Sequence, residues 1–73
     1  MDARIADFLL QRLTWQAPLL HITHQQIAAE LGTSREVVSR ILEDFSVACL
    51  IETGRGSIRL LDPQGLQRRR RVW

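Results

Sequence analysis

The spacing of apolar side chains predicts three helices in the chain before residue 49. Residues 2–14 carry them three and four positions apart, the period of a helix packed on one side, with Asp2 as a candidate cap. Residues 23–31 and 34–48 repeat this period and are separated by Gly32. Glycine adopts the left-handed conformation that ends many helices without steric cost, so we expect a sharp turn between these two helices.

The pattern changes to alternation after the third predicted helix. Residues 50–53 and 57–61 lie on either side of Gly54-Arg55-Gly56, and the second segment alternates Ile58 and Leu60 with its other side chains, which predicts a β-hairpin. The segment 19–22 is short enough to be a strand or an extended connector. Asp62-Pro63 is typical of a helix start, here of a short helix through Leu66. The predicted fold class is mostly α with a small β-hairpin, a winged helix-turn-helix with a three-helix core plus a wing.

Local capping patterns support the two central helices. Thr23 with Gln26 three positions later fits a capping box, in which each side chain accepts from the backbone N–H of the other residue. After the glycine, Thr33 or Ser34 restarts the chain as the N-cap of the next helix. Two short helices joined at this spacing are typical of a helix-turn-helix.

The length of 73 residues allows one small domain with a thin core. Such a core leaves little room for a deep, water-excluding pocket, which argues against an enzyme. We expect a winged helix-turn-helix domain over residues 1–67 and a basic, disordered tail over residues 68–73. The apolar runs are too short to span a membrane, and a single cysteine suits a reducing cytoplasm, so the predicted localisation is cytoplasmic.

The formal charge of +2 is weak evidence for a nucleic-acid partner, because four of the ten basic residues are the consecutive arginines 68–71. The rest of the chain has six basic residues (ten minus four) against eight acidic ones, a formal charge of −2. Local placement is more informative than this total. Arg35, Arg40, Arg55 and Arg59 fall in the helix-turn-helix and the hairpin, so one positive face is predicted.

The third predicted helix has one polar side and one apolar side. At about 100° per residue, its polar side carries Arg35, Glu36, Ser39 and Arg40, and its apolar side carries Val38, Ile41, Leu42 and Phe45. A helix of this kind can dock in a DNA major groove. There each arginine can donate twice to guanine O6 and N7, and the glutamate can accept from cytosine N4.

At residue level the chain resembles the Crp/Fnr family of bacterial transcription regulators. The resemblance covers about Ile5 to Leu66, almost the whole chain. It is carried by Ile22-Thr23-His24-Gln25-Gln26-Ile27-Ala28, by the run from Leu31 to Arg40, and by Leu50-Ile51 at the start of the hairpin.

The resemblance implies sequence-specific DNA binding through a recognition helix at about 34–47, in the major groove of a half-site with a TGA core. The residues that match the base-contacting positions are Arg35, Glu36 and Arg40, and the pattern Glu-x-x-Ser-Arg adds Ser39 as in an Fnr-like branch. The outer bases of the half-site stay open, because Arg35 is similar to the cyclic-AMP receptor branch and Ser39 to the Fnr branch.

Candidate contacts to the DNA backbone lie at the helix starts and at the hairpin tip. They are Thr23, Gln25, Ser34 and Arg55. A helix N-terminus offers free N–H groups to a phosphate, and an arginine between two glycines can reach the DNA backbone. For Arg55 an exposed turn residue without a ligand is the alternative.

Structural roles compete with base contact on the third helix. Thr33 and Glu36 form a second capping-box pattern, and Arg40 has Asp44 four positions later as a partner for an ion pair. The alternative function is a winged helix for protein–protein interaction or dimerisation without base-specific DNA binding. Against it, the exposed side of the third helix is polar and charged rather than apolar.

The resemblance also implies partners beyond this chain. Double-stranded DNA is the expected ligand, an effector domain is expected N-terminal to this region, the full-length protein is expected to be a homodimer, and RNA polymerase is a candidate contact. No membrane partner and no cofactor in this chain are expected. His21, His24 and Cys49 match no closed zinc spacing, so no metal site is predicted. Cys49 is expected in the core, and Trp15 as a packing residue after the first helix.

Overall fold

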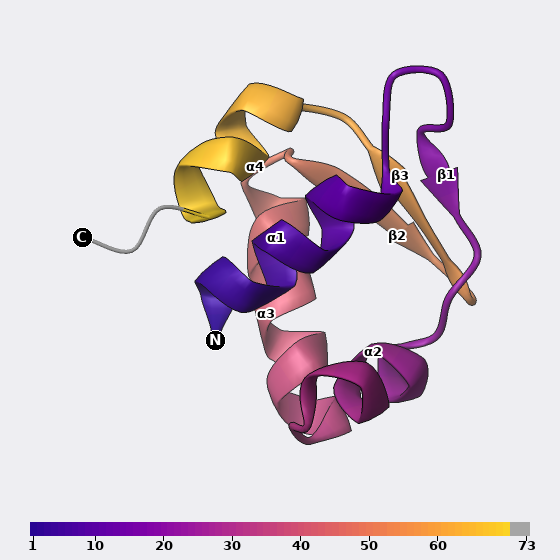
Figure 1. The fold of residues 1–73 in the computed structure, drawn as a ribbon, viewed down its shortest axis with the longest axis vertical. Coiled ribbons are helices and arrows are strands. Elements are labelled where there is room, and N and C mark those ends of the chain that lie inside the picture. Colours follow the sequence, from indigo (N-terminus) through magenta and orange to yellow (C-terminus); the bar gives the residue numbers. More distant parts are fainter. Residues whose placement is uncertain (71–73) are drawn as a thin grey trace.

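Four helices and a three-stranded sheet build residues 1–70, the part of the chain that the computed structural model describes (Figure 1). In chain order they are α1 (Asp2–Arg12), β1 (Leu19–Leu20), α2 (His24–Leu31), α3 (Arg35–Val47), β2 (Ile51–Gly54), β3 (Ser57–Leu60) and α4 (Pro63–Arg70). The predicted fold class is confirmed, with one further strand and a longer fourth helix beside the three-helix core and the wing. No helix in this part of the chain is both long and apolar enough to cross a membrane.

The predicted hairpin of β2 and β3 gains a third strand from the segment that precedes α2. β3 lies between β1 and β2 and is antiparallel to both, so Ile58 is opposite Leu20 on one side and Thr53 on the other. Arg55 and Gly56 form the turn, where Gly56 has a φ of 64° that glycine adopts without steric cost. β1 therefore connects the segment that leads into α2 to the wing, the hairpin of β2 and β3.

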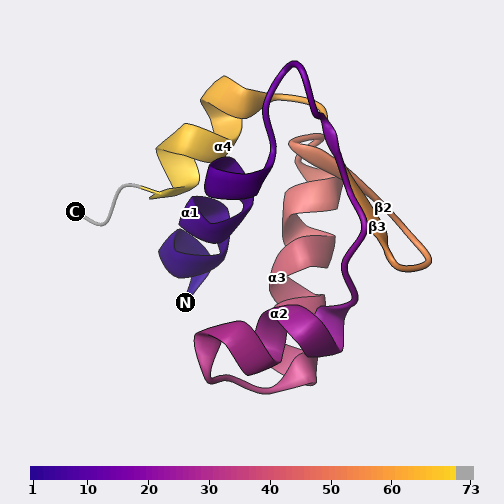
Figure 2. The ribbon, with the colours of Figure 1, turned by 45° about the vertical axis from the view of Figure 1, so that its right-hand side comes forward.

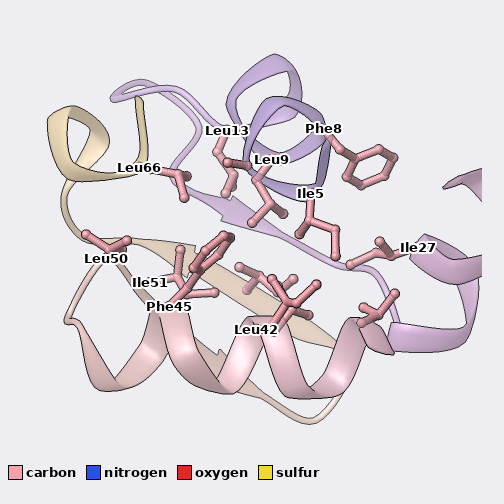
Figure 3. Packing of buried hydrophobic residues seen from close by; sticks show 14 of the residues in the cluster. Ile5, Phe8, Leu9, Leu13, Ile27, Leu42, Phe45, Leu50, Ile51 and Leu66 are labelled. Carbon is pink, nitrogen blue, oxygen red and sulfur yellow. The ribbon is translucent and has the colours of Figure 1, made fainter. Parts of the chain in front are cut away.

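One hydrophobic core joins the helices to the sheet. Leu9 of α1, Phe45 of α3 and Leu66 of α4 are fully buried, and Figure 3 shows their side chains pointing toward one another. The predicted apolar side of α3 is buried in full: Val38, Ile41, Leu42 and Phe45. Each such side chain contributes about 1.5–3 kcal/mol, so the core holds α3 in one rotation about its axis and keeps its polar side outward.

Short-range contacts fix the start of α2 and the turn between α2 and α3. The predicted capping box is present, because the Gln26 N–H donates to Thr23 Oγ1 over 3.1 Å and the Thr23 N–H donates to Gln26 Oε1 over 2.8 Å. Gly32 takes the left-handed conformation with φ 68° and ψ 38°. Ser34 is the N-cap of α3, and its Oγ accepts from the Val37 N–H over 3.3 Å. The helix-turn-helix prediction is confirmed.

The beginning and the end of α1 differ from the prediction. Met1 occupies the N-cap position and Asp2 lies in the first turn, so Asp2 is not a cap, although its charge suits the positive end of the helix dipole. Trp15 lies in the loop after α1 with 71% of its surface exposed, so the prediction of a packing residue is wrong. Thr14 and Ala17 exchange backbone hydrogen bonds across this loop, which leaves the indole outside the core.

Cys49 is exposed, and the prediction that it is a core residue is also wrong. It follows Ala48, the C-cap of α3, and has a φ of 60°. The Cys49 N–H donates to the Ser46 carbonyl and the Leu50 N–H to the Phe45 carbonyl, each over 3.0 Å. These two bonds make a Schellman motif, in which glycine is the usual residue at the place of Cys49. The chain reverses there, so that Leu50 enters the core instead.

The arginines expected in a disordered tail extend α4 through Arg70. Arg69 Nη1 lies 3.1 Å from Asp44 Oδ2 of α3, and Arg70 Nη1 lies 3.5 Å from Asp7 Oδ1 of α1. α1 and α4 are side by side in both Figure 1 and Figure 2. The prediction of disorder is therefore wrong for residues 68–70, because carboxylates from distant segments hold two of these arginines. Residues 71–73, with Arg71, lie outside the described residues.

Candidate nucleic-acid interface

The polar side of α3 presents three exposed ionic side chains and one half-buried hydroxyl. Arg35, Glu36 and Arg40 are exposed, whereas Ser39 is half-buried. Because the opposite side of the helix is anchored in the core, these side chains project outward as predicted. Guanidinium donors beside a carboxylate acceptor are the groups that bind the edges of G·C pairs in a major groove.

Two structural roles that competed with base contact are not found. The N-cap of α3 is Ser34, one residue later than the second capping-box pattern requires, so Glu36 lies in the first turn outside any capping box. Asp44 pairs with Arg69 of α4, and Arg40 takes part in none of the ion pairs within residues 1–70. Glu36 and Arg40 are therefore available to a ligand.

A shallow hollow of about 290 Å³ gathers the start of α2, the start of α3 and the tip of the wing. It is lined by Thr23, His24, Gln25, Arg35, Gly54, Arg55 and Gly56. Three of the four predicted backbone contacts thus surround one space, together with the predicted base contact Arg35, while the fourth, Ser34, precedes Arg35 in the chain as the N-cap of α3. The helix N-terminus of α2 and two guanidinium groups favour an anion such as phosphate in this hollow.

Ser39 already has a partner within the protein. Its Oγ lies 2.7 Å from Nδ1 of His24, in a half-buried contact between the middle of α3 and the first residue of α2. The sequence did not indicate His24 as a site residue, because Ser39 is 15 positions away and no local motif links the two. Any contact of Ser39 with a base is therefore made by a hydroxyl that His24 also binds.

The chain matches known proteins over nearly its whole length. Residues 3–69 match the family model of the Crp-like helix-turn-helix domain. The chain belongs to this family. Over 49 residues, 67% of the chain, this Crp-like domain is 37% identical to the transcriptional regulator SdrP of Thermus thermophilus, of which it covers 24%.

Solved structures of Crp and Fnr relatives share the fold of this Crp-like domain. A crp/fnr-family transcriptional regulator from Eubacterium rectale has a TM-score of 0.89 and 40% identity, over 99% of this chain and 34% of that one. The catabolite activator protein of Thermus thermophilus has a TM-score of 0.81 and 33% identity, over 94% of this chain and 33% of that one. The Crp-like domain thus spans about a third of these solved chains and about a quarter of SdrP.

These matches also identify the class of function. The predicted family is confirmed, and with it the prediction of a DNA-binding module of transcription regulation. The relatives are transcriptional regulators, so the prediction that the chain is not an enzyme is confirmed as well. The groups that carry the function of the Crp-like domain are therefore expected on its surface, where a ligand can bind, rather than in a catalytic centre.

An acidic residue that the sequence analysis did not single out lies on the polar side of α3. Glu43 follows Glu36 by seven positions, about two helical turns, and is exposed. It lines a second hollow, of about 650 Å³, together with Arg40. The helical period alone could have identified it, because that period places Glu43 between Ser39 and Arg40 around the helix axis.

The histidine and cysteine side chains of the Crp-like domain do not gather into a cluster. Within residues 1–70, no group of three or more His, Cys, Asp or Glu side chains is placed to hold a metal ion. His21 is exposed before α2, His24 is bonded to Ser39, and Cys49 lies past the C-terminal end of α3.

Proposed function

We propose that this Crp-like domain binds one half-site of a DNA duplex, with α3 in the major groove and the wing against the backbone. The observation that supports it best is the hollow between α2, α3 and the wing tip, which adjoins the exposed polar side of α3 at Arg35. A phosphate in the hollow would place the bases of the adjoining groove beside α3. Backbone and base contacts would then form together.

The base contacts in this proposal come from Arg35, Glu36, Arg40 and Ser39. Arg35 and Arg40 are exposed arginines that can each donate twice to guanine O6 and N7, and Glu36 can accept from cytosine N4. A TGA core supplies one G·C pair on which an arginine and the glutamate can act together. The resemblance to Crp and Fnr regulators supports this core, and the outer bases of the half-site are left open.

The backbone contacts come from Thr23, Gln25, Ser34 and Arg55. The first residues of α2 line the hollow, and the backbone N–H groups of a first helical turn are free for a ligand except the one that Thr23 binds through the capping box. Ser34 accepts from Val37 but keeps its hydroxyl hydrogen for a phosphate oxygen. Arg55 reaches from the turn of the wing.

The remaining partners are proposed for a longer protein that would contain this domain. Because the domain spans about a third of its solved relatives, we propose that it is joined to an N-terminal effector domain and acts as a homodimer. A two-fold dimer would bind inverted half-sites separated by about one helical turn of DNA. RNA polymerase is a candidate contact of the bound dimer, and the proposed compartment is the cytoplasm.

The test is a fluorescence anisotropy titration of the domain with a palindromic duplex containing TGA and with a scrambled duplex, across a salt series. Arg40→Ala should weaken binding to the TGA duplex by about 1–3 kcal/mol, roughly 5- to 150-fold, and remove the preference over the scrambled duplex. Arg4→Ala, which deletes an exposed arginine of α1, is the charge-matched control and should retain the preference. If Arg40→Ala leaves affinity and preference unchanged, the base-contact assignment is wrong.

A further inference from the structure

Within residues 1–70, the contact between His24 and Ser39 is the one side-chain hydrogen bond that joins α2 to α3. The His24 Nδ1 to Ser39 Oγ distance is 2.7 Å, and both residues are half-buried. Ser39 lies between Arg35 and Arg40 on the polar side of α3, and His24 also lines the hollow with Arg35 and Arg55. One imidazole therefore touches both the candidate phosphate site and a candidate base contact.

The hydrogen bond limits what Ser39 can offer to DNA. A hydroxyl has one hydrogen to donate and two lone pairs that accept. When Ser39 donates its hydrogen to Nδ1, only lone pairs remain for a base edge. It can then accept from the amino groups of adenine or cytosine, and it cannot donate to guanine O6, guanine N7 or thymine O4.

The tautomer of His24 decides whether Ser39 donates or accepts in this bond. Nδ1 is used by Ser39, so Nε2 is the ring nitrogen left for a second partner, and His24 is among the residues that line the hollow. A phosphate oxygen accepts and never donates, so a neutral imidazole that binds phosphate through Nε2 carries its one ring hydrogen there. In this tautomer Nδ1 is the acceptor. This step rests on the proposed function, since it takes the hollow to be a phosphate site.

We propose that His24 is a positioning residue for base specificity: it binds the hydroxyl hydrogen of Ser39 and thereby makes Ser39 an acceptor that selects an amino group at one base position. The hydroxyl of a serine without this partner would rotate about its Cβ–Oγ bond and offer either its hydrogen or a lone pair. The base position facing Ser39 would then accept adenine, cytosine, guanine or thymine with little distinction. His24 thus converts a permissive hydroxyl into a selective one.

The experiment measures the affinity of the domain for the palindromic TGA duplex and for a set of duplexes in which each base pair of the half-site is replaced in turn. Ser39→Ala and His24→Ala should each lower the preference at the same base pair by about three- to tenfold, the range of one hydrogen bond. His24→Asn keeps an acceptor near the position of Nδ1 and should restore the preference. His24→Gln, whose acceptor lies one bond further out, should not. The double variant should lose no more preference than Ser39→Ala alone.

Three results would overturn the proposal. One is a Ser39→Ala protein that keeps every base preference. Another is a His24→Ala protein that keeps the preference that Ser39→Ala loses. The third is a uniform loss over all duplexes in His24→Ala that His24→Asn does not reverse. Arg40→Ala is measured in the same series. If Arg40→Ala changes neither affinity nor base preference, the proposed function itself is rejected. If Arg40→Ala loses base preference while His24→Ala keeps it, the positioning role alone is rejected. Thermal unfolding of each variant separates misfolding from lost selectivity.

Discussion

Arg69 of α4 donates to the carboxylate of Asp44 of α3 over 3.1 Å. The Arg69 guanidinium also lies over the ring of Phe45, with its carbon 5.5 Å from the ring centroid. The side chains of the ion pair are 38% and 60% exposed, so solvent screens the attraction. The contacts of Arg69 with Asp44 and Phe45 therefore hold the last turn of α4 against α3 mainly by packing, and only weakly by charge.

Arg69→Ala should lower the free energy of unfolding by about 0.5–1 kcal/mol. Part of this loss should persist in high salt, because the contact with Phe45 includes packing of the arginine side chain as well as charge. Arg68→Ala, an exposed neighbour on the same helix, is the control and should change little. Urea denaturation at low and at high salt measures both variants, and equal losses for the two would contradict the role of the α4–α3 contact.

Gly65→Ala should destabilise the domain although alanine is the better helix former. Gly65 is buried in α4, and a Cβ there would overlap the side chains of Leu50 and Asp62. Leu50 is in the core, and Asp62 Oδ1 accepts from the Gly65 N–H over 3.1 Å, so neither side chain can move away freely. Overpacking of this kind costs about 1–3 kcal/mol, which exceeds the helix-propensity gain of about 1 kcal/mol. Gln67→Ala, exposed on the same helix, should be neutral or slightly stabilising in the same melt.

Cys49→Gly should stabilise the domain by about 0.5–1 kcal/mol. Cys49 has a φ of 60° at the position of the Schellman motif where glycine is usual. A side chain in the left-handed conformation costs about 1–2 kcal/mol, which Cys49→Gly would recover. The greater freedom of glycine in the unfolded chain offsets part of this stabilisation. The thermal midpoint measures it. A midpoint below that of the parent protein would mean that the Cys49 side chain makes a stabilising contact, for which the candidate is the 3.9 Å approach of its Sγ to the Val47 carbonyl.

Glu43→Gln should tighten DNA binding, on the proposed placement of α3 in the major groove. Glu43 brings a negative charge to the polar side of the helix near the DNA phosphates. Its removal should raise the affinity for TGA and scrambled duplexes alike, by about two- to fivefold at low salt and less at high salt. Glu30→Gln lies near the opposite end of α2 from the hollow and is the matched control. An unchanged affinity for Glu43→Gln would place that residue away from the DNA.

The sequence predicted those features that depend on neighbours within a few positions. The Thr23–Gln26 capping box and the left-handed Gly32 are local, and the buried side of α3 follows from the helical period alone. The errors at Trp15 and Cys49 have a different origin. Both are apolar side chains that a composition argument assigns to the core, but each lies where the path of the backbone turns the side chain to solvent.

The residues of the candidate site also fall into two groups, those that local sequence predicts and those that only the tertiary fold brings together. The outward direction of Arg35, Glu36 and Arg40 follows from helical spacing. The grouping of Thr23, Gln25 and Arg55 around one hollow needs the wing to fold back beside α2, and no local pattern encodes that return. The His24–Ser39 bond likewise exists only once α2 has packed against α3.

The two-residue strand β1 has a consequence for how the domain would bind a duplex. Because Leu20 pairs with Ile58 of β3, the chain that leads into α2 and the hairpin belong to one sheet. The start of α2 and the tip of the wing are therefore both connected to this sheet. On the proposed placement of the domain, these two elements would meet the DNA backbone at a set spacing, so the width of the groove would contribute to the choice of duplex.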